Sequence, residues 1–169
     1  MREFLKNLLQ KVRAQFGWDS ANEHLVSTLR ARVRATPSIR AILRTRAEPH
    51  GYFIETEVVQ CTNGSFSWSV REGKGEQFRV INVSLTPMIL EQLRSINLSA
   101  ILEELQQLRE SQLHSMPDRE FVGGRWGLLF LASENVGIWA IGRYPLSGDP
   151  VGDTAVERLW RLALLVTKS

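Results

Sequence analysis

The sequence predicts an α+β fold: one domain over residues 1–169, with a five-stranded antiparallel sheet and helices mainly on one face, in the order α(α)-βββ-αα-ββ-α. Apolar residues recur at helical spacing through residues 1–47. Residues 52–85 instead alternate polar and apolar positions between turn signals, as strands do. Two near-continuous apolar runs, 126–132 and 136–144, follow further helical stripes. Such blocks of strands and helices favour an antiparallel sheet covered by helices, and 169 residues fit one domain.

The basic N-terminal segment, about residues 1–47, is predicted to be helical throughout. Gly17 is expected to end a first helix, and Ser20 caps a second. Thr36 before Pro37 is typical of a fresh helix start, so a third helix is expected to reach about residue 47. The first helix is amphipathic, and its apolar side consists of Phe4, Leu5, Leu8, Leu9, Val12 and Phe16. That side can dock on the body of the protein, on a second subunit or on a membrane surface.

An α+β body is predicted over about residues 48–169, and it begins with three strands. The first, Tyr52–Cys61, is rich in aromatic and β-branched residues and leads into an Asn-Gly turn. In the second strand Phe66, Trp68 and Val70 share one face and polar residues share the other, so Trp68 is expected in the core. The third strand is expected at about 78–85, with a bulge near Val80 and Ile81.

The rest of the body is predicted to contain helices on either side of a strand pair. Thr86 and Pro87 start a helix that reaches about Ile96, and a second helix follows a break near Asn97. The apolar runs at 126–132 and 136–144 form the last hairpin. A final helix, capped by Asp153 or Thr154, is expected to bury Val156, Leu159, Trp160, Ala163 and Leu164.

The sequence contains no recognisable catalytic or ligand-binding motif. Its single cysteine, Cys61, excludes an intramolecular disulfide and a multi-cysteine zinc site, and it fits a reducing compartment such as the cytoplasm. Phosphate-binding loops, nucleophile elbows and zinc-protease motifs are absent. Glu55 and Glu57 share a strand face, which is open to acid–base chemistry, to solvent or to contact with the arginine-rich helices. No catalytic residue, cofactor or metal is predicted, and the protein is not expected to be an enzyme.

Charge is distributed unevenly along the chain. Residues 1–46 contain ten basic and three acidic residues, whereas the rest contains eleven basic and fifteen acidic residues. Arginine dominates the basic residues, and its planar guanidinium suits carboxylates and phosphates. An anionic partner is therefore plausible, although the basic segment can also contact the acidic body or be solvated.

The predicted element order resembles the type III secretion chaperone and YbjN-like superfamily of bacterial proteins. The resemblance rests on the hairpin Tyr52–Val70, the passage Val80–Pro87 into the following helix, the apolar hairpin Trp126–Tyr144 and the final helix. It implies a small, dimeric cytoplasmic protein without catalysis that binds extended peptides or partner proteins. The arginine-rich start and the lack of strong acidity depart from the pattern, and they favour a general adaptor over a secretion chaperone.

The sequence thus supports two functional hypotheses. The first is a partner-protein or peptide-binding adaptor or chaperone-like regulator, expected to be a homodimer. Its partner-binding residues are predicted to be Arg30, Arg34, Arg40, Arg44, Leu128, Phe130, Ile138 and Ile141. The last four belong to the final hairpin, which has more apolar surface than one covering layer of helices can use. The alternative is a protein that binds nucleic acid or an anionic surface through Arg30, Arg32, Arg34, Arg40, Arg44 and Arg46.

The arrangement of these arginines distinguishes the two hypotheses. One exposed stripe of arginines would favour nucleic-acid binding, because the arginines must contact phosphates that lie along one strip. Ion pairs with Glu55, Glu57, Glu103 or Glu104 would count against it.

Overall fold

The structure, a computed structural model, describes three long stretches of the chain and a short piece near its end. The backbone is described at residues 2–47, 53–114, 126–143, 154, 155, 157–159, 161 and 162. Side chains are described at 19–47, 53–110, 127–141 and the same positions from 154 onward. Predictions for the loops 115–119 and 145–153, and for Val156, Trp160, Ala163 and Leu164, fall outside these residues.

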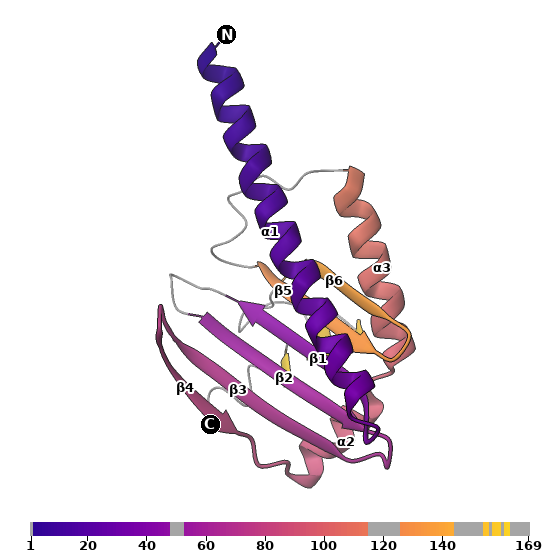
Figure 1. Ribbon diagram of the computed structural model, residues 1–169. Helices are drawn as coiled ribbons and strands as arrows, with labels where there is room; N and C mark the ends of the chain where they lie inside the picture. The colour runs from indigo at the N-terminus through magenta and orange to yellow at the C-terminus, as the bar shows by residue number, and fades with distance from the viewer. Residues whose placement is uncertain are drawn as a thin grey trace.

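The described residues form an α+β fold around one open antiparallel sheet (Figure 1). The sheet has six strands rather than the expected five, in the order β4-β3-β2-β1-β5-β6. Each strand pairs antiparallel with its neighbour. The elements are α1 (Arg2–Ala35), β1 (Ile39–Ala47), β2 (Phe53–Cys61), β3 (Phe66–Lys74), β4 (Gln77–Asn82), α2 (Pro87–Ser95), α3 (Leu98–His114), β5 (Trp126–Ser133) and β6 (Gly137–Arg143).

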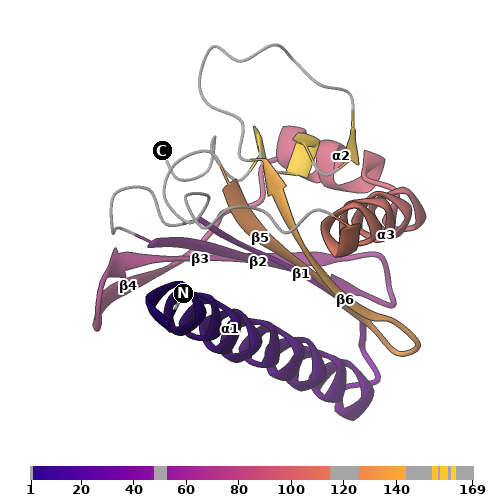
Figure 2. The ribbon, with the colours of Figure 1, turned by 90° about the horizontal axis from the view of Figure 1, so that it is seen from above.

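Helices cover both faces of the sheet rather than mainly one (Figure 2). α2 and α3 lie on one face, where Trp68, Leu105 and Leu131 belong to the larger buried cluster. Of the described helices that pack on the sheet, α1 is the one on the other face, where it contacts β1, β5 and β6. Its buried side chains, Val26, Leu29 and Val33, belong to a second cluster that includes Phe130 and Trp139. The sheet is therefore the middle layer between two apolar cores.

The sixth strand comes from residues 39–47, which were wrongly predicted to be helical. Ala41, Leu43, Thr45 and Ala47 are buried on the α2–α3 face, and the side chains between them lie on the α1 face. This period of two is the period of a strand, although Ile39, Ile42 and Leu43 also match helical spacing. β1 pairs with β2, the next strand along the chain, on one side and with the distant β5 on the other, so tertiary pairing decides its structure.

α1 is a single helix, not the two that were expected. It continues through Gly17 and ends at Ala35, just before Pro37. A glycine within a helix costs only about 1 kcal/mol relative to alanine, which a long helix can absorb. Proline disfavours helical geometry in the residue before it, so Pro37 ends the helix where the sequence was expected to start one.

Most of the remaining predictions are confirmed. The β2–β3 turn has Gly64 at φ 82°, and Trp68 is 3% exposed. Thr86 caps α2 by accepting a hydrogen bond from the Ile89 amide. The bulge expected near Val80 is absent, because the β3–β4 register is regular, and the irregularity lies instead between Ile39 and Ala41.

Near the end of the chain, the described residues agree with the predicted final helix. Ala155, 157–159, 161 and 162 are helical. The Thr154 hydroxyl accepts a hydrogen bond from the Glu157 amide, as expected of a helix cap, and Leu159 is buried.

Candidate partner-binding surface

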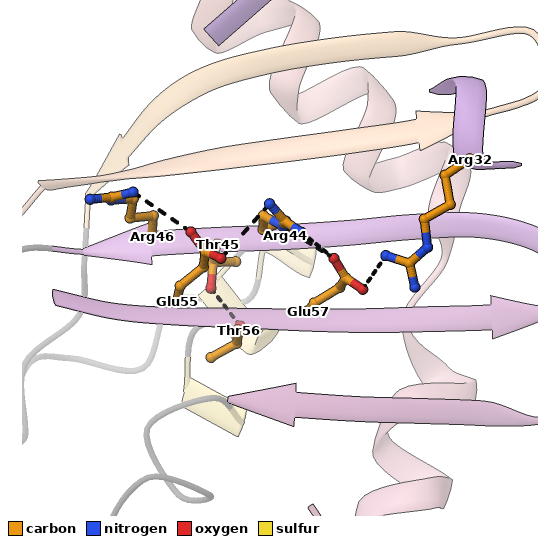
Figure 3. Close-up of polar contacts among 7 residues, drawn as sticks. All are labelled: Arg32, Arg44, Thr45, Arg46, Glu55, Thr56 and Glu57. Atoms are coloured by element: carbon orange, nitrogen blue, oxygen red, sulfur yellow. Dashed lines mark hydrogen bonds and ion pairs between the residues drawn. The ribbon is translucent and has the colours of Figure 1, made fainter. Parts of the chain in front are cut away.

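A row of arginines and glutamates lies on the α1 face of the sheet (Figure 3). Strand alternation puts Arg44 and Arg46 of β1 on this face, and the register sets them opposite Glu57 and Glu55 of β2. Arg32 reaches the same row from the last turns of α1. The row therefore connects the helix to two central strands.

Glu57 is the centre of this row. Its Oε2 accepts from Arg44 Nη2 at 2.5 Å and Nε at 3.2 Å, and its Oε1 accepts from Arg32 Nη1 at 2.6 Å. Burial works to raise the pKa of Glu57, but the hydrogen bonds and charges of Arg44 and Arg32 outweigh it, so the pKa lies below its ordinary value of 4.5. Glu57 is therefore ionised at neutral pH and unsuited to act as a proton donor.

Glu55 extends the row more loosely. Its carboxylate lies 3.8 Å from Arg44 Nη1 and 3.7 Å from Arg46 Nη1. The side chains of Glu55 and Glu57 are 11% and 13% exposed, and both belong to this ion-pair network. Of the roles left open for this carboxylate pair, contact with arginines is therefore the observed one.

The arginines expected to meet a nucleic acid are mostly engaged within the protein. Arg30 and Arg34 donate to the backbone oxygens of Glu134 and Asn135, in the β5–β6 turn. Arg32, Arg44 and Arg46 pair with Glu55 or Glu57. Arg40 is exposed on β1. The six arginines thus form no single exposed stripe.

The final hairpin was expected to need a partner because one helical layer cannot cover it. That premise was wrong, since α1 and α3 cover it from opposite faces. Leu128, Phe130 and Ile141 pack in the α1 cluster, where Phe130 is 1% exposed, and Ile138 packs in the other cluster. These four predicted partner-binding residues therefore belong to the core or its margin.

The surface that sequence reasoning missed lies at the other end of the sheet. Within the part of the chain that the structure describes, α1 packs on β1, β5 and β6, and no helix covers β3 and β4 on the same face (Figure 1). Every residue of β4 is exposed, including Phe78 at 48% and Val80 at 61%. The polar face of β3 was predicted from the alternation of its residues. The exposure of β4 was not predicted, because its polar and apolar residues do not alternate cleanly.

Among the described strands β4 is also an edge strand, with a neighbour on one side only. The Val83 amide donates to the Trp68 carbonyl of β3, and Lys74 pairs with Gln77 at the hairpin turn. Backbone groups of successive residues point to opposite sides of a strand. Phe78, Val80 and Asn82 therefore direct their N–H and C=O groups away from β3. An unpaired edge of this kind is a template for another strand.

An arginine and two aromatic rings occupy the open face beside this edge. The Arg71 guanidinium carbon lies 3.7 Å from the centre of the Phe78 ring and 5.9 Å from that of Phe53. Gly73 lies between the two phenylalanines in the strand register, where a Cβ would clash with the Gln77 carbonyl oxygen. We call Phe53, Arg71, Phe78 and Val80 the open surface.

Other chemistry finds little support in the described part of the chain. No group of three histidine, cysteine, aspartate or glutamate side chains there is placed to hold a metal ion. The helices of that part include none with the length and apolar content of a membrane span. No protein-family model, curated protein or solved structure matches the chain. The resemblance to secretion chaperones therefore stays a prediction.

Proposed function

We propose that the protein binds an extended segment of a partner protein along the free edge of β4, and acts as an adaptor or chaperone-like regulator without catalysis. The observation that carries this proposal is the combination of outward backbone groups at Phe78, Val80 and Asn82 with the open surface beside them. Backbone hydrogen bonds to an edge strand supply affinity, and neighbouring side chains supply specificity.

The nucleic-acid alternative loses its main support in the ion pairs. Arg32, Arg44 and Arg46 are held by Glu55 and Glu57, so binding phosphates would break contacts that already neutralise them. Strand edges, in turn, offer alternating donors and acceptors, which match a peptide backbone and not a phosphodiester chain.

Two finer points belong to the same proposal. A cytoplasmic location is supported by the single cysteine, Cys61, which needs no oxidising compartment. A homodimer could not use the faces of the final hairpin, since these pack against α1 and α3, but β6 is the outer strand at that end of the described sheet. Pairing of two β4 edges is one geometry for such a dimer, and pairing of two β6 edges is the other.

The β4 edge can be blocked without breaking the sheet. Val80→Pro removes an N–H that points away from β3, and proline is tolerated on strand edges with that orientation. Val80→Thr keeps the N–H and the β-branched shape, so it serves as the control. We expect the proline variant to capture native partners roughly tenfold less well, since a backbone hydrogen bond contributes ~1 kcal/mol and the ring obstructs the incoming strand.

The experiment compares the wild-type protein and both variants as bait in extract from the native host, with circular dichroism to confirm that each is folded. Loss of the same proteins from the folded proline variant, with retention by the threonine variant, supports the proposal. Equal capture by all three baits would place binding elsewhere on the molecule.

A further inference from the structure

The exposed charged side chains of strands β1 to β4 are all positive. Within these strands the acidic side chains are turned inward: those of Glu55, Glu57 and Glu72 are 11%, 13% and 7% exposed, and each pairs with an arginine. The exposed charged residues in the same strands are all basic, namely Arg40, Arg71, Lys74 and Arg79. Glu76, in the β3–β4 turn, is the exposed acidic neighbour. Arg79 pairs with Glu72 on the α2–α3 face, so Arg71 is the exposed charge beside Phe78 and Val80 on the α1 face.

Arg71 differs from Arg32, Arg44 and Arg46, which pair with glutamates on the α1 face. It stands opposite Glu55 in the β2–β3 register, yet Glu55 is engaged by Arg44 and Arg46. Among the described residues no carboxylate lies within ion-pair distance of Arg71, and its guanidinium lies over the rings of Phe53 and Phe78.

Stacking prepares this guanidinium for a carboxylate. A guanidinium on an aromatic face keeps its N–H groups free along the edge of its plane, and that edge can bind a carboxylate through two parallel hydrogen bonds. The rings also hold the side chain in place, which reduces the conformational entropy lost on binding. Because the guanidinium lies closer to Phe78 than to Phe53, it leans toward the free edge.

We propose that the segment bound at β4 is acidic and that one of its carboxylates pairs with Arg71. This inference rests on the proposed function, because it assigns the chemistry of the partner at the same edge. A second copy of this chain is a poorer occupant, since it would bring another positive β4 edge, with its own Arg71 and Lys74, against the first.

The probes are three short acetylated and amidated peptides in which valine alternates with glutamate, glutamine or lysine. Binding is followed on the full chain by amide chemical shifts of Phe78, Val80 and Asn82. We expect the glutamate peptide to shift these amides, the glutamine peptide to bind about tenfold more weakly, and the lysine peptide not to bind.

Two substitutions assign the effect to Arg71. Arg71→Met keeps an apolar side chain over the rings and should weaken the glutamate peptide about tenfold while leaving the glutamine peptide unchanged. Arg94→Met removes the same charge from an exposed site on α2 and should change neither peptide. Any general loss of attraction would appear in both variants.

Each contrary result has a distinct meaning. Equal binding of the glutamate and glutamine peptides at β4 would overturn the acidic partner and leave edge binding intact. The acidic partner would also be overturned if the glutamate peptide failed to shift the β4 amides. The same holds if light scattering showed a dimer formed through β4. The proposed function is judged separately, by partner capture with Val80→Pro and Val80→Thr.

Discussion

The Glu57→Gln substitution tests whether the arginine–glutamate row stabilises the attachment of α1. Glutamine keeps the size of the side chain but removes the charge that Arg44 and Arg32 contact. The Arg44 pair is mostly shielded, with side chains 20% and 13% exposed, so its loss is expected to cost ~1.5–3 kcal/mol. Arg32 is 45% exposed, so its share is discounted to ~0.2–1 kcal/mol. Since glutamine can still accept one hydrogen bond, we expect a net loss of about 2 kcal/mol.

The assay is urea unfolding of the wild type and the variant at several pH values. The pKa of Glu57 is lowered in the folded state, so its contribution is present above the ordinary value of 4.5 and is lost as pH falls through the folded pKa. The difference between the two proteins should therefore be largest near neutral pH and shrink in acid. Glu103→Gln, at an exposed position on α3, should stay within ~0.5 kcal/mol of wild type. If the two variants match at neutral pH, the row does not stabilise the fold.

Three further predictions follow from the packing and the charges. Trp68→Ala should lower the free energy of unfolding by ~3–5 kcal/mol in a denaturant titration, because Trp68 is 3% exposed; a loss under about 1 kcal/mol would contradict its burial. Gly73→Ala should destabilise the β3–β4 hairpin by ~1–3 kcal/mol in thermal unfolding, because its Cβ would clash with the Gln77 carbonyl oxygen, whereas Ser69→Ala should be nearly neutral. Nucleic-acid probes should bind only at the ~10⁻⁴–10⁻⁶ M level at physiological salt; nanomolar binding that is lost in Arg40→Ala would restore the nucleic-acid hypothesis.

The fold could be predicted from sequence where local signals suffice. The strands around Trp68, the Asn63–Gly64 turn and the Thr86 cap depend on neighbours a few residues away, and all were predicted correctly. Residues 39–47 depend on β2, the next strand along the chain, and on β5, which pairs with them from a distant part of the chain. Their apolar residues fit both periods, so only the tertiary pairing decides between helix and strand.

The candidate surface was harder to predict than the fold. Contact of Glu55 and Glu57 with arginines was one of the alternatives the sequence left open, and it is the one observed. Arg71 was missed because its isolation depends on two facts absent from its local sequence. One is that other arginines engage Glu55, and the other is that α1 does not extend its cover to β3 and β4.

The central position of β1 has a consequence for how the chain is made. Within the described sheet, β1 to β4 pair with their neighbours in sequence, but β1 also pairs with β5. This pairing sets Ala47 opposite Gly127, roughly 80 positions later. At ~5–20 residues per second, translation leaves β1 without that neighbour for about 4–16 s. During this interval β1 is a temporary outer strand, open to pairing with other nascent chains. Arg40, Arg44 and Arg46 put charge along it, and charged side chains on an outer strand oppose such aggregation.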